Sequence, residues 1–105
     1  TKGFTALGTA MMLAASRGGS AEALKAELAE SRPDLLRYLA NQVPGMYSKA
    51  YRWVAELDEI AAFIGEEFPE RDMLQAAARL YERMAEDFED RKEEIGKLDR
   101  FLEKS

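Results

Sequence analysis

Apolar side chains recur every third or fourth position along most of this chain, and this spacing constrains its fold more than any other feature. The clearest run lies in the last third, where the steps alternate between three and four from Leu74 to Leu102. Such steps place side chains on one face of a helix, as in the seam of a heptad repeat. No stretch shows the period-two alternation of β-branched residues that marks a strand. The sequence therefore predicts an all-α fold.

Glycine and proline divide the chain into about five helices. Gly18-Gly19 is expected to end the first, because glycine takes up the left-handed conformation past a helix end at little cost. Pro33 suits the first turn of a new helix, where its missing N–H would have no intrahelical partner. Pro44-Gly45 either ends that helix or kinks it, and Gly65 marks the end of the next. The prediction is a single helical bundle.

The last helix is expected to begin at Phe68-Pro69 and to run as one long amphipathic helix to Leu102. Its seam would measure about 42 Å, longer than the roughly 30 Å diameter of a domain this size. Arg91 occupies a seam position and Gly96 weakens the helix, so fraying or a bend is expected there. The overhanging end, which includes Leu98, must fold back at Gly96 or pair with another chain. We favour pairing, and therefore expect a homodimer.

The expected core draws large apolar residues from all the predicted helices. Between Thr1 and Arg17 these residues alternate with small ones, a composition that lets another helix approach closely. In the helix around Trp53, a turn of about 100° per residue places Val54 and Leu57 on one buried stripe, with Trp53 at its border. The core residues that we expect are Phe4, Leu7, Met11, Leu28, Leu36, Leu39, Val54, Leu57, Ile60, Leu74, Tyr81 and Met84.

Composition excludes several classes of function. The 105 residues include no cysteine and no histidine, which removes disulfides, thiolate chemistry and every histidine-based catalytic arrangement. The net charge of −5 argues against a nucleic-acid or anionic-membrane partner, since both need clustered basic residues. No apolar stretch approaches the roughly 20 residues that span a bilayer, and no signal peptide opens the chain, so a cytoplasmic location is expected.

The helix around Trp53 carries the best candidates for binding. Lys49 and Arg52 lie one turn apart, a spacing that could hold a phosphate or carboxylate, although ordinary solvent exposure is the alternative. Glu56 and Glu59 share the same face and could contribute to a metal site, but an ion pair from Arg52 explains Glu56 more simply. We expect no catalytic residue, no cofactor-binding residue and no metal site in this chain.

Four stretches, taken in order, resemble one enzyme family. They are the opening Thr1-Lys2-Gly3 followed by a small-residue helix, the Leu24 to Leu39 stretch broken at Pro33, the run Lys49 to Ala61, and Ala76 to Tyr81. Their residue patterns resemble those of the C-terminal helical domain of NAD(P)-dependent oxidoreductases related to 6-phosphogluconate dehydrogenase. This branch is labelled phosphogluconate dehydrogenase (decarboxylating)-like. The resemblance covers roughly residues 1 to 88, and every motif in it is a helical packing pattern.

The resemblance implies a part of an enzyme. Relatives transfer hydride between NAD or NADP and a hydroxy acid, with the cofactor on a separate N-terminal dinucleotide-binding domain. Their helical half closes the substrate site and often pairs subunits. In the family, the catalytic lysine lies several residues before the Thr-Lys-Gly motif. The resemblance therefore implies that this chain lacks that lysine and is inactive by itself. Lys2, on the same helix, joins Lys49 and Arg52 as a possible substrate-binding residue.

Two domain assignments and one alternative function follow. Residues 1–88 are expected to form the substrate and dimerisation domain, and residues 89–105 a charged amphipathic helical extension outside the family pattern. The alternative is a stand-alone or engineered helical-bundle scaffold or interaction module without catalytic activity, in which the resemblance marks only ancestry.

Overall fold

A computed structural model describes residues 1–103, and within them the chain forms six helices and no strand. This confirms the predicted all-α class with one helix more than expected. The helices are α1 (Lys2–Arg17), α2 (Ala21–Ser31), α3 (Pro33–Met46), α4 (Ala50–Ile64), α5 (Arg71–Glu89) and α6 (Glu93–Leu102). Residues 104 and 105, at the end of the predicted extension, lie outside the described part.

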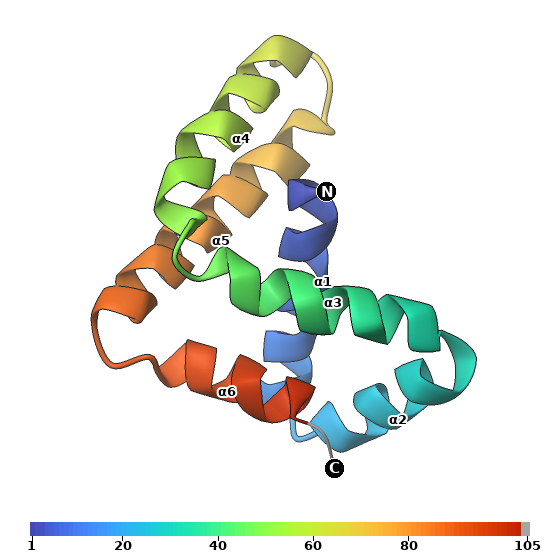
Figure 1. The fold of residues 1–105 in the computed structure, drawn as a ribbon. Coiled ribbons are helices and arrows are strands. Elements are labelled where there is room, and N and C mark those ends of the chain that lie inside the picture. The colour runs from blue at the N-terminus through green and yellow to red at the C-terminus, as the bar shows by residue number, and fades with distance from the viewer. Residues whose placement is uncertain (104–105) are drawn as a thin grey trace.

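The helices form two connected groups (Figure 1). The α4–α5 pair is an antiparallel hairpin that projects from the rest of the molecule. In the other group, α1 packs against α2, α3, α5 and α6, and α3 crosses it in front. The whole measures 43 × 32 × 23 Å. Helix α1 is therefore the central element of this group, because the two helices that follow it and the last helix, α6, all pack against it.

The helix boundaries follow the glycine and proline positions. Gly19 and Gly65 adopt positive φ angles of 77° and 95°, just beyond the ends of α1 and α4. Pro33 occupies the first turn of α3, as predicted. Pro44 neither ends α3 nor lies beyond it, because the helix continues to Met46. These signals located the short connections correctly to within about two residues.

The predicted long last helix is wrong as one continuous helix, because the chain breaks at 90–92, next to the bend expected near Arg91. Lys92 takes a left-handed conformation (φ 58°), which is unusual for a residue other than glycine. The carbonyl of Asp87 accepts hydrogen bonds from the amides of Asp90 and Lys92, and its carboxylate accepts one from the amide of Ile95. The bonds from Lys92 and Ile95 measure 2.9 and 2.8 Å. Asp87 thus stabilises the break and caps the next helix.

Because of this break, α6 folds back onto the bundle, and within residues 1–103 its apolar face does not overhang. Its apolar face is buried against α1 and neighbouring helices through Ile95, Leu98 and Phe101. The chain does fold back, but at residues 90–92 and not at Gly96, which lies inside α6. The argument for a homodimer through this stripe is therefore wrong, since Leu98 has no exposed surface left to offer.

The core agrees with prediction in most helices and differs in α1. Leu28, Leu39, Leu57, Tyr81 and Met84 are buried. Three other predicted core residues are half-buried against the core: Leu36, Val54 and Leu74. Four others are exposed, namely Phe4, Leu7, Met11 and Ile60. In α1 the side chains of Phe4, Leu7 and Met11 point outward. The opposite face is buried and comprises Thr5, Ala6, Gly8, Thr9, Met12 and Leu13.

The reversed orientation of α1 has a steric cause at Gly8. A Cβ atom built on Gly8 would lie 2.4 Å from a methyl carbon of Leu39 on α3. Only a glycine permits this approach without moving the leucine, which is itself buried. The small residues of α1 therefore lie on its contact face together with Met12 and Leu13, and Phe4, Leu7 and Met11 on the opposite side are left uncovered.

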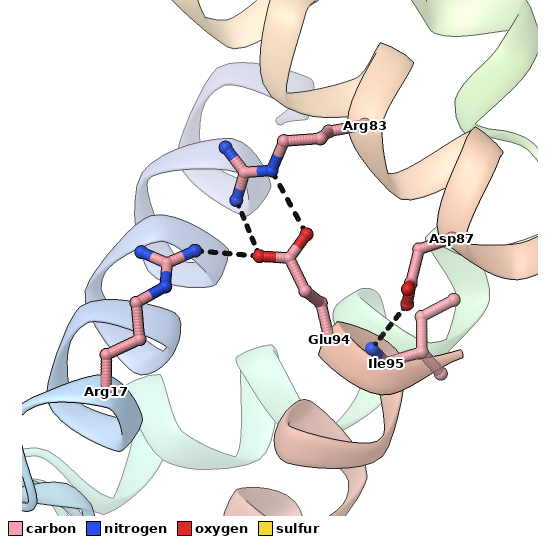
Figure 2. A network of polar contacts seen from close by, with 5 residues as sticks. All are labelled: Arg17, Arg83, Asp87, Glu94 and Ile95. Atoms are coloured by element: carbon pink, nitrogen blue, oxygen red, sulfur yellow. Dashed lines mark hydrogen bonds and ion pairs between the residues drawn. The ribbon is translucent and has the colours of Figure 1, made fainter. Parts of the chain in front are cut away.

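Polar contacts fasten the beginning of α6 to two other helices (Figure 2). Glu94 receives two hydrogen bonds from Arg83 on α5, at 3.0 and 2.9 Å, and one from Arg17 on α1, at 2.7 Å. The bonds from Arg83, and then that from Arg17, hold the pKa of Glu94 below its usual range. Farther along α6, the Tyr47 hydroxyl donates to Asp99 at 2.9 Å. Both ends of α6 are thus tied to the bundle.

We expect Glu94→Gln to lower the free energy of unfolding at pH 7 by about 1 to 2 kcal/mol, since both arginines are half exposed and partly screened. A depressed carboxylate pKa stabilises the fold above the unfolded pKa, about 4.3, and this contribution disappears as the pH falls through the folded pKa. Urea unfolding at pH 7 and pH 3 measures both values. Glu89→Gln, at an exposed position, should change neither. A deficit in Glu94→Gln that persists undiminished at pH 3 would contradict the ionic origin.

Candidate functional site

The first turn of α1 meets the exposed side of α4 through Lys2. The Lys2 ammonium forms an ion pair with Glu56 and lies 5.3 Å from the ring centroid of Trp53. Both partners are on α4, one turn apart, so a single cation contacts a carboxylate and an indole face together. Lys2 and Glu56 are each between one-third and one-half exposed. The cluster of Lys2, Trp53 and Glu56, which we call the α1–α4 cluster, therefore lies at the surface, within reach of a solute.

Tyr81 supports this cluster from beneath. Its ring is fully buried and meets Trp53 edge to face, with centroids 5.3 Å apart. Its hydroxyl donates a hydrogen bond to the main-chain carbonyl of Lys2. Burial raises the pKa of Tyr81 well above its ordinary value, so the phenol stays protonated and acts as a fixed donor. Tyr81 holds the first turn of α1 in place, and its position gives it no role in proton transfer.

Lys49 and Arg52 lie at the beginning of α4, on the same exposed stripe as Glu56. Within residues 1–103 neither side chain forms an ion pair, and the Arg52 guanidinium rests 6.0 Å from the Tyr51 ring centroid. The expected pair from Arg52 to Glu56 is not formed, because Glu56 binds Lys2 instead. Two cations one turn apart are thus left available for an anion.

The predicted site residues come together only in part. Lys2 reaches α4 through its contacts with Trp53 and Glu56, whereas Lys49 and Arg52 reach the same region only as neighbours along α4. The contact between Lys2 and Glu56 joins positions 54 residues apart, and no spacing in the sequence indicates it. What the sequence did indicate was the grouping of Lys49, Arg52 and Glu56 on one exposed stripe.

A second feature, an apolar groove of about 630 Å³, runs between α1, α2 and α3. One wall is the exposed side of α1, and the other is formed by residues of α2 and α3. The lining comprises Thr1, Phe4, Leu7, Gly8, Met11, Met12, Leu24, Leu28, Arg32, Asp34, Leu35, Tyr38 and Leu39. Arg32 and Asp34 form an exposed ion pair with each other at 2.9 Å, so the charges in the lining are already matched.

Two kinds of feature are absent from residues 1–103. No group of three or more acidic side chains is close enough to hold a metal ion there. No helix in the same range combines the length and apolar character that crossing a membrane requires.

Comparison with known families decides which group this chain belongs to. A family model described as a domain of unknown function, DUF1932, matches residues 15–84, about two-thirds of the chain. The chain belongs to this family. DUF1932 is the C-terminal helical domain of 6-phosphogluconate dehydrogenase-like NAD(P)-binding oxidoreductases, which confirms the resemblance seen in the sequence. Searches of the curated proteins and of the solved structures gave no match.

The DUF1932 match covers most of the candidate site but not Lys2. It includes α2, α3, α4 and most of α5, and therefore Lys49, Arg52, Trp53, Glu56 and Tyr81. Most of α1 and all of α6 lie outside the matched residues. Both nevertheless pack into the same core, since α6 buries its apolar face against α1.

Proposed function

We propose that this chain is the helical half of an NAD(P)-dependent, 6-phosphogluconate dehydrogenase-like oxidoreductase, in which it closes the substrate site and pairs subunits. The observation that supports it most is the exposed stripe of α4, where Lys49 and Arg52 lie without ion-pair partners in residues 1–103. Membership of the DUF1932 family gives this stripe its context. The resemblance implies hydroxy-acid substrates, which are anions.

In this proposal, the α1–α4 cluster and the two cations have different roles in the substrate site. Arg52 would bind the carboxylate or phosphate of the substrate through its paired N–H groups, and Lys49 would add a second positive charge one turn away. Lys2, already paired with Glu56, would line the site. Its ion pair fixes the first turn of α1, the helix on which the resemblance places the catalytic lysine of the family.

NAD or NADP would be held by an N-terminal dinucleotide-binding domain of a parent protein. A dinucleotide fingerprint needs a strand, a glycine-rich turn and a helix. In residues 1–103 the pair Gly18-Gly19 joins two helices, so these residues do not fit such a site. In a titration of this chain, we therefore expect no saturable binding of NAD or NADP with a dissociation constant below about 100 μM. Calorimetry measures it, and tighter binding would contradict the proposal.

The substrate role is tested by joining this chain to a dinucleotide-binding half from the family. We expect Lys49→Ala and Arg52→Ala each to raise KM for an anionic hydroxy acid by about tenfold or more, the equivalent of a lost charge-assisted hydrogen bond. Arg52→Lys should recover only part, because lysine lacks the paired donors. Glu59→Ala is the matched control on the same stripe and should not raise KM. Unchanged KM in both cation variants would refute the role.

One observation favours the alternative, a helical module that serves association alone. Large apolar side chains are exposed in two places, on α1 and at the α4–α5 tip, and such patches mark interaction surfaces. If the joined protein proves inactive with every hydroxy acid while the chain still associates, the interaction module is the better description.

A further inference from the structure

The α4–α5 hairpin turns one face towards α1, and only part of that face is covered. The contact between Trp53 and Tyr81 lies where the first turn of α1 packs. Ile60 lies about two turns beyond Trp53 on the same side of α4, and Met73 about two turns before Tyr81 on α5. Both are exposed, Ile60 by 45% and Met73 by 69%. The hairpin thus extends beyond the N-terminal end of α1 with apolar side chains uncovered (Figure 1).

The free end of the hairpin also exposes two aromatic side chains. Phe63, in the last turn of α4, is 90% exposed, and Phe68, in the turn before α5, is 49% exposed. Together with Ile60 and Met73 they form an apolar patch within residues 58–73, which we call the α4–α5 tip. Apolar side chains gathered in this way on a surface mark a site of interaction.

The α4–α5 tip accounts for the whole net charge of the chain. It contains six acidic residues and one basic residue, while the chain as a whole carries −5, so the other residues are balanced. The single basic residue, Arg71, already pairs with two of the acidic ones, at 3.9 and 3.2 Å. Glu59, Glu67 and Glu70 are exposed and form no ion pair within residues 1–103. The apolar patch is therefore surrounded by uncompensated negative charge.

This combination of apolar surface and charge selects one class of partner. Two copies of the chain meeting at the tip would repel each other, and nucleic acids and anionic membranes carry the same sign of charge. A protein segment with apolar residues on one side and lysines or arginines beside them is complementary in both respects. Because α1 already packs on the same face as a helix, a helical segment extends the existing arrangement.

We propose that the α4–α5 tip is a docking surface for a basic amphipathic helix of another protein. The apolar side of that helix would lie on Ile60, Phe63 and Met73, and its basic residues would face the surrounding glutamates. Glu56, which pairs with the end of α1, is about 10 Å from Phe63 along α4, so the contact would span about two turns of the partner. This partner is neither a substrate nor a second subunit, and the proposal therefore goes beyond the proposed function.

Fluorescence anisotropy with the 105-residue chain tests the docking surface. The probe is a labelled synthetic helix of about 18 residues, with leucines on one side and lysines flanking them. We expect saturable binding with a dissociation constant on the order of 10 μM at about 50 mM salt, and binding about fivefold weaker at about 0.3 M salt, because the charges are exposed. A probe with glutamates in place of the lysines should not bind. A scrambled probe without an apolar side should bind about tenfold more weakly or worse.

Substitutions at the tip separate the apolar from the charged contribution. Phe63→Ser should weaken probe binding about tenfold or more without loss of helicity by circular dichroism, because the ring is exposed. Glu67→Lys combined with Glu70→Lys should weaken it to a similar extent and reduce its salt dependence. Phe4→Ser and Glu86→Lys are the matched controls, at an exposed aromatic residue of α1 and an exposed acidic residue of α5 outside the tip. Both should bind the probe as the unchanged chain does.

Several results would overturn the proposal. They are no saturable binding up to about 200 μM, equal binding of the glutamate probe, and unchanged binding in Phe63→Ser. Sedimentation velocity adds another: if the chain forms a dimer that Phe63→Ser dissociates, a second copy covers the tip and the proposal is wrong. None of these measurements uses a hydroxy acid or KM, so they do not test the substrate role of Lys49 and Arg52, and the two proposals can fail separately.

Discussion

Replacing Tyr81 with alanine is expected to lower the free energy of unfolding by about 3 to 5 kcal/mol, the range for removing a large buried aromatic side chain. The ring has no exposed surface and packs edge to face against Trp53, and its hydroxyl binds the carbonyl of Lys2. The substitution would therefore leave a cavity and release the first turn of α1 from α5. Urea denaturation followed by circular dichroism gives the value.

Tyr81→Phe separates the two contributions. It keeps the ring and removes only the hydroxyl, so the loss should be about 1 kcal/mol, the usual net value of one hydrogen bond. If Tyr81→Ala costs less than about 1 kcal/mol, the ring is not packed between the helices, and the α1–α4 cluster lacks the support described for it.

Leu98→Asp is expected to cost about 4 kcal/mol or more. Leu98 has no exposed surface on α6, so the substitution removes a packed side chain and places an unpaired carboxylate in the core. The docking of α6 onto α1 should fail. Arg100→Asp, at an exposed position of the same helix, should cost less than about 1 kcal/mol. Urea denaturation at about 2 μM keeps association out of the measurement. A variant that only lost dimerisation at normal monomer stability would restore the overhanging-helix interpretation.

The sequence predicted the elements well because helix signals are local. Gly19, Pro33 and Gly65 act through their own backbone geometry and needed no tertiary information. On α4, the predicted stripe is buried at Ala50, Leu57 and Ala61 and half-buried at Val54 and Ile64. One apolar face opposite one charged face leaves a single way to pack such a helix.

Where two faces were both apolar, the sequence could not choose between them. In α1 the side chains of Phe4, Leu7 and Met11 suggested the core, but close contact between Gly8 and Leu39 favours the opposite orientation. The bend expected near Arg91 is a full break after α5, and its form was hidden because Lys92 adopts positive φ without glycine and the heptad spacing continues across it. Its cause is the set of hydrogen bonds to Asp87, which exists only once the turn has formed.

In the candidate site, too, the local features were predicted and the long-range contact was not. Lys49, Arg52 and Glu56 were grouped correctly on one exposed stripe, since they follow from helical spacing alone. The pairing of Glu56 with Lys2 was missed, because it depends on where the first turn of α1 meets α4. Whether Lys2, Lys49 and Arg52 bind a substrate stays a prediction.

The contact between α1 and α6 also constrains the order in which the helices can pack during synthesis. Neighbouring helices such as α4 and α5 can pair as soon as the ribosome has released them, since they are adjacent in the chain. Helix α1 emerges before α6, and part of its surface is covered only when Glu94 and Leu98 have been made. Until then the nascent chain carries a nearly uncharged helix with apolar residues open on several sides. During that interval the exposed apolar surface makes the nascent chain prone to aggregation.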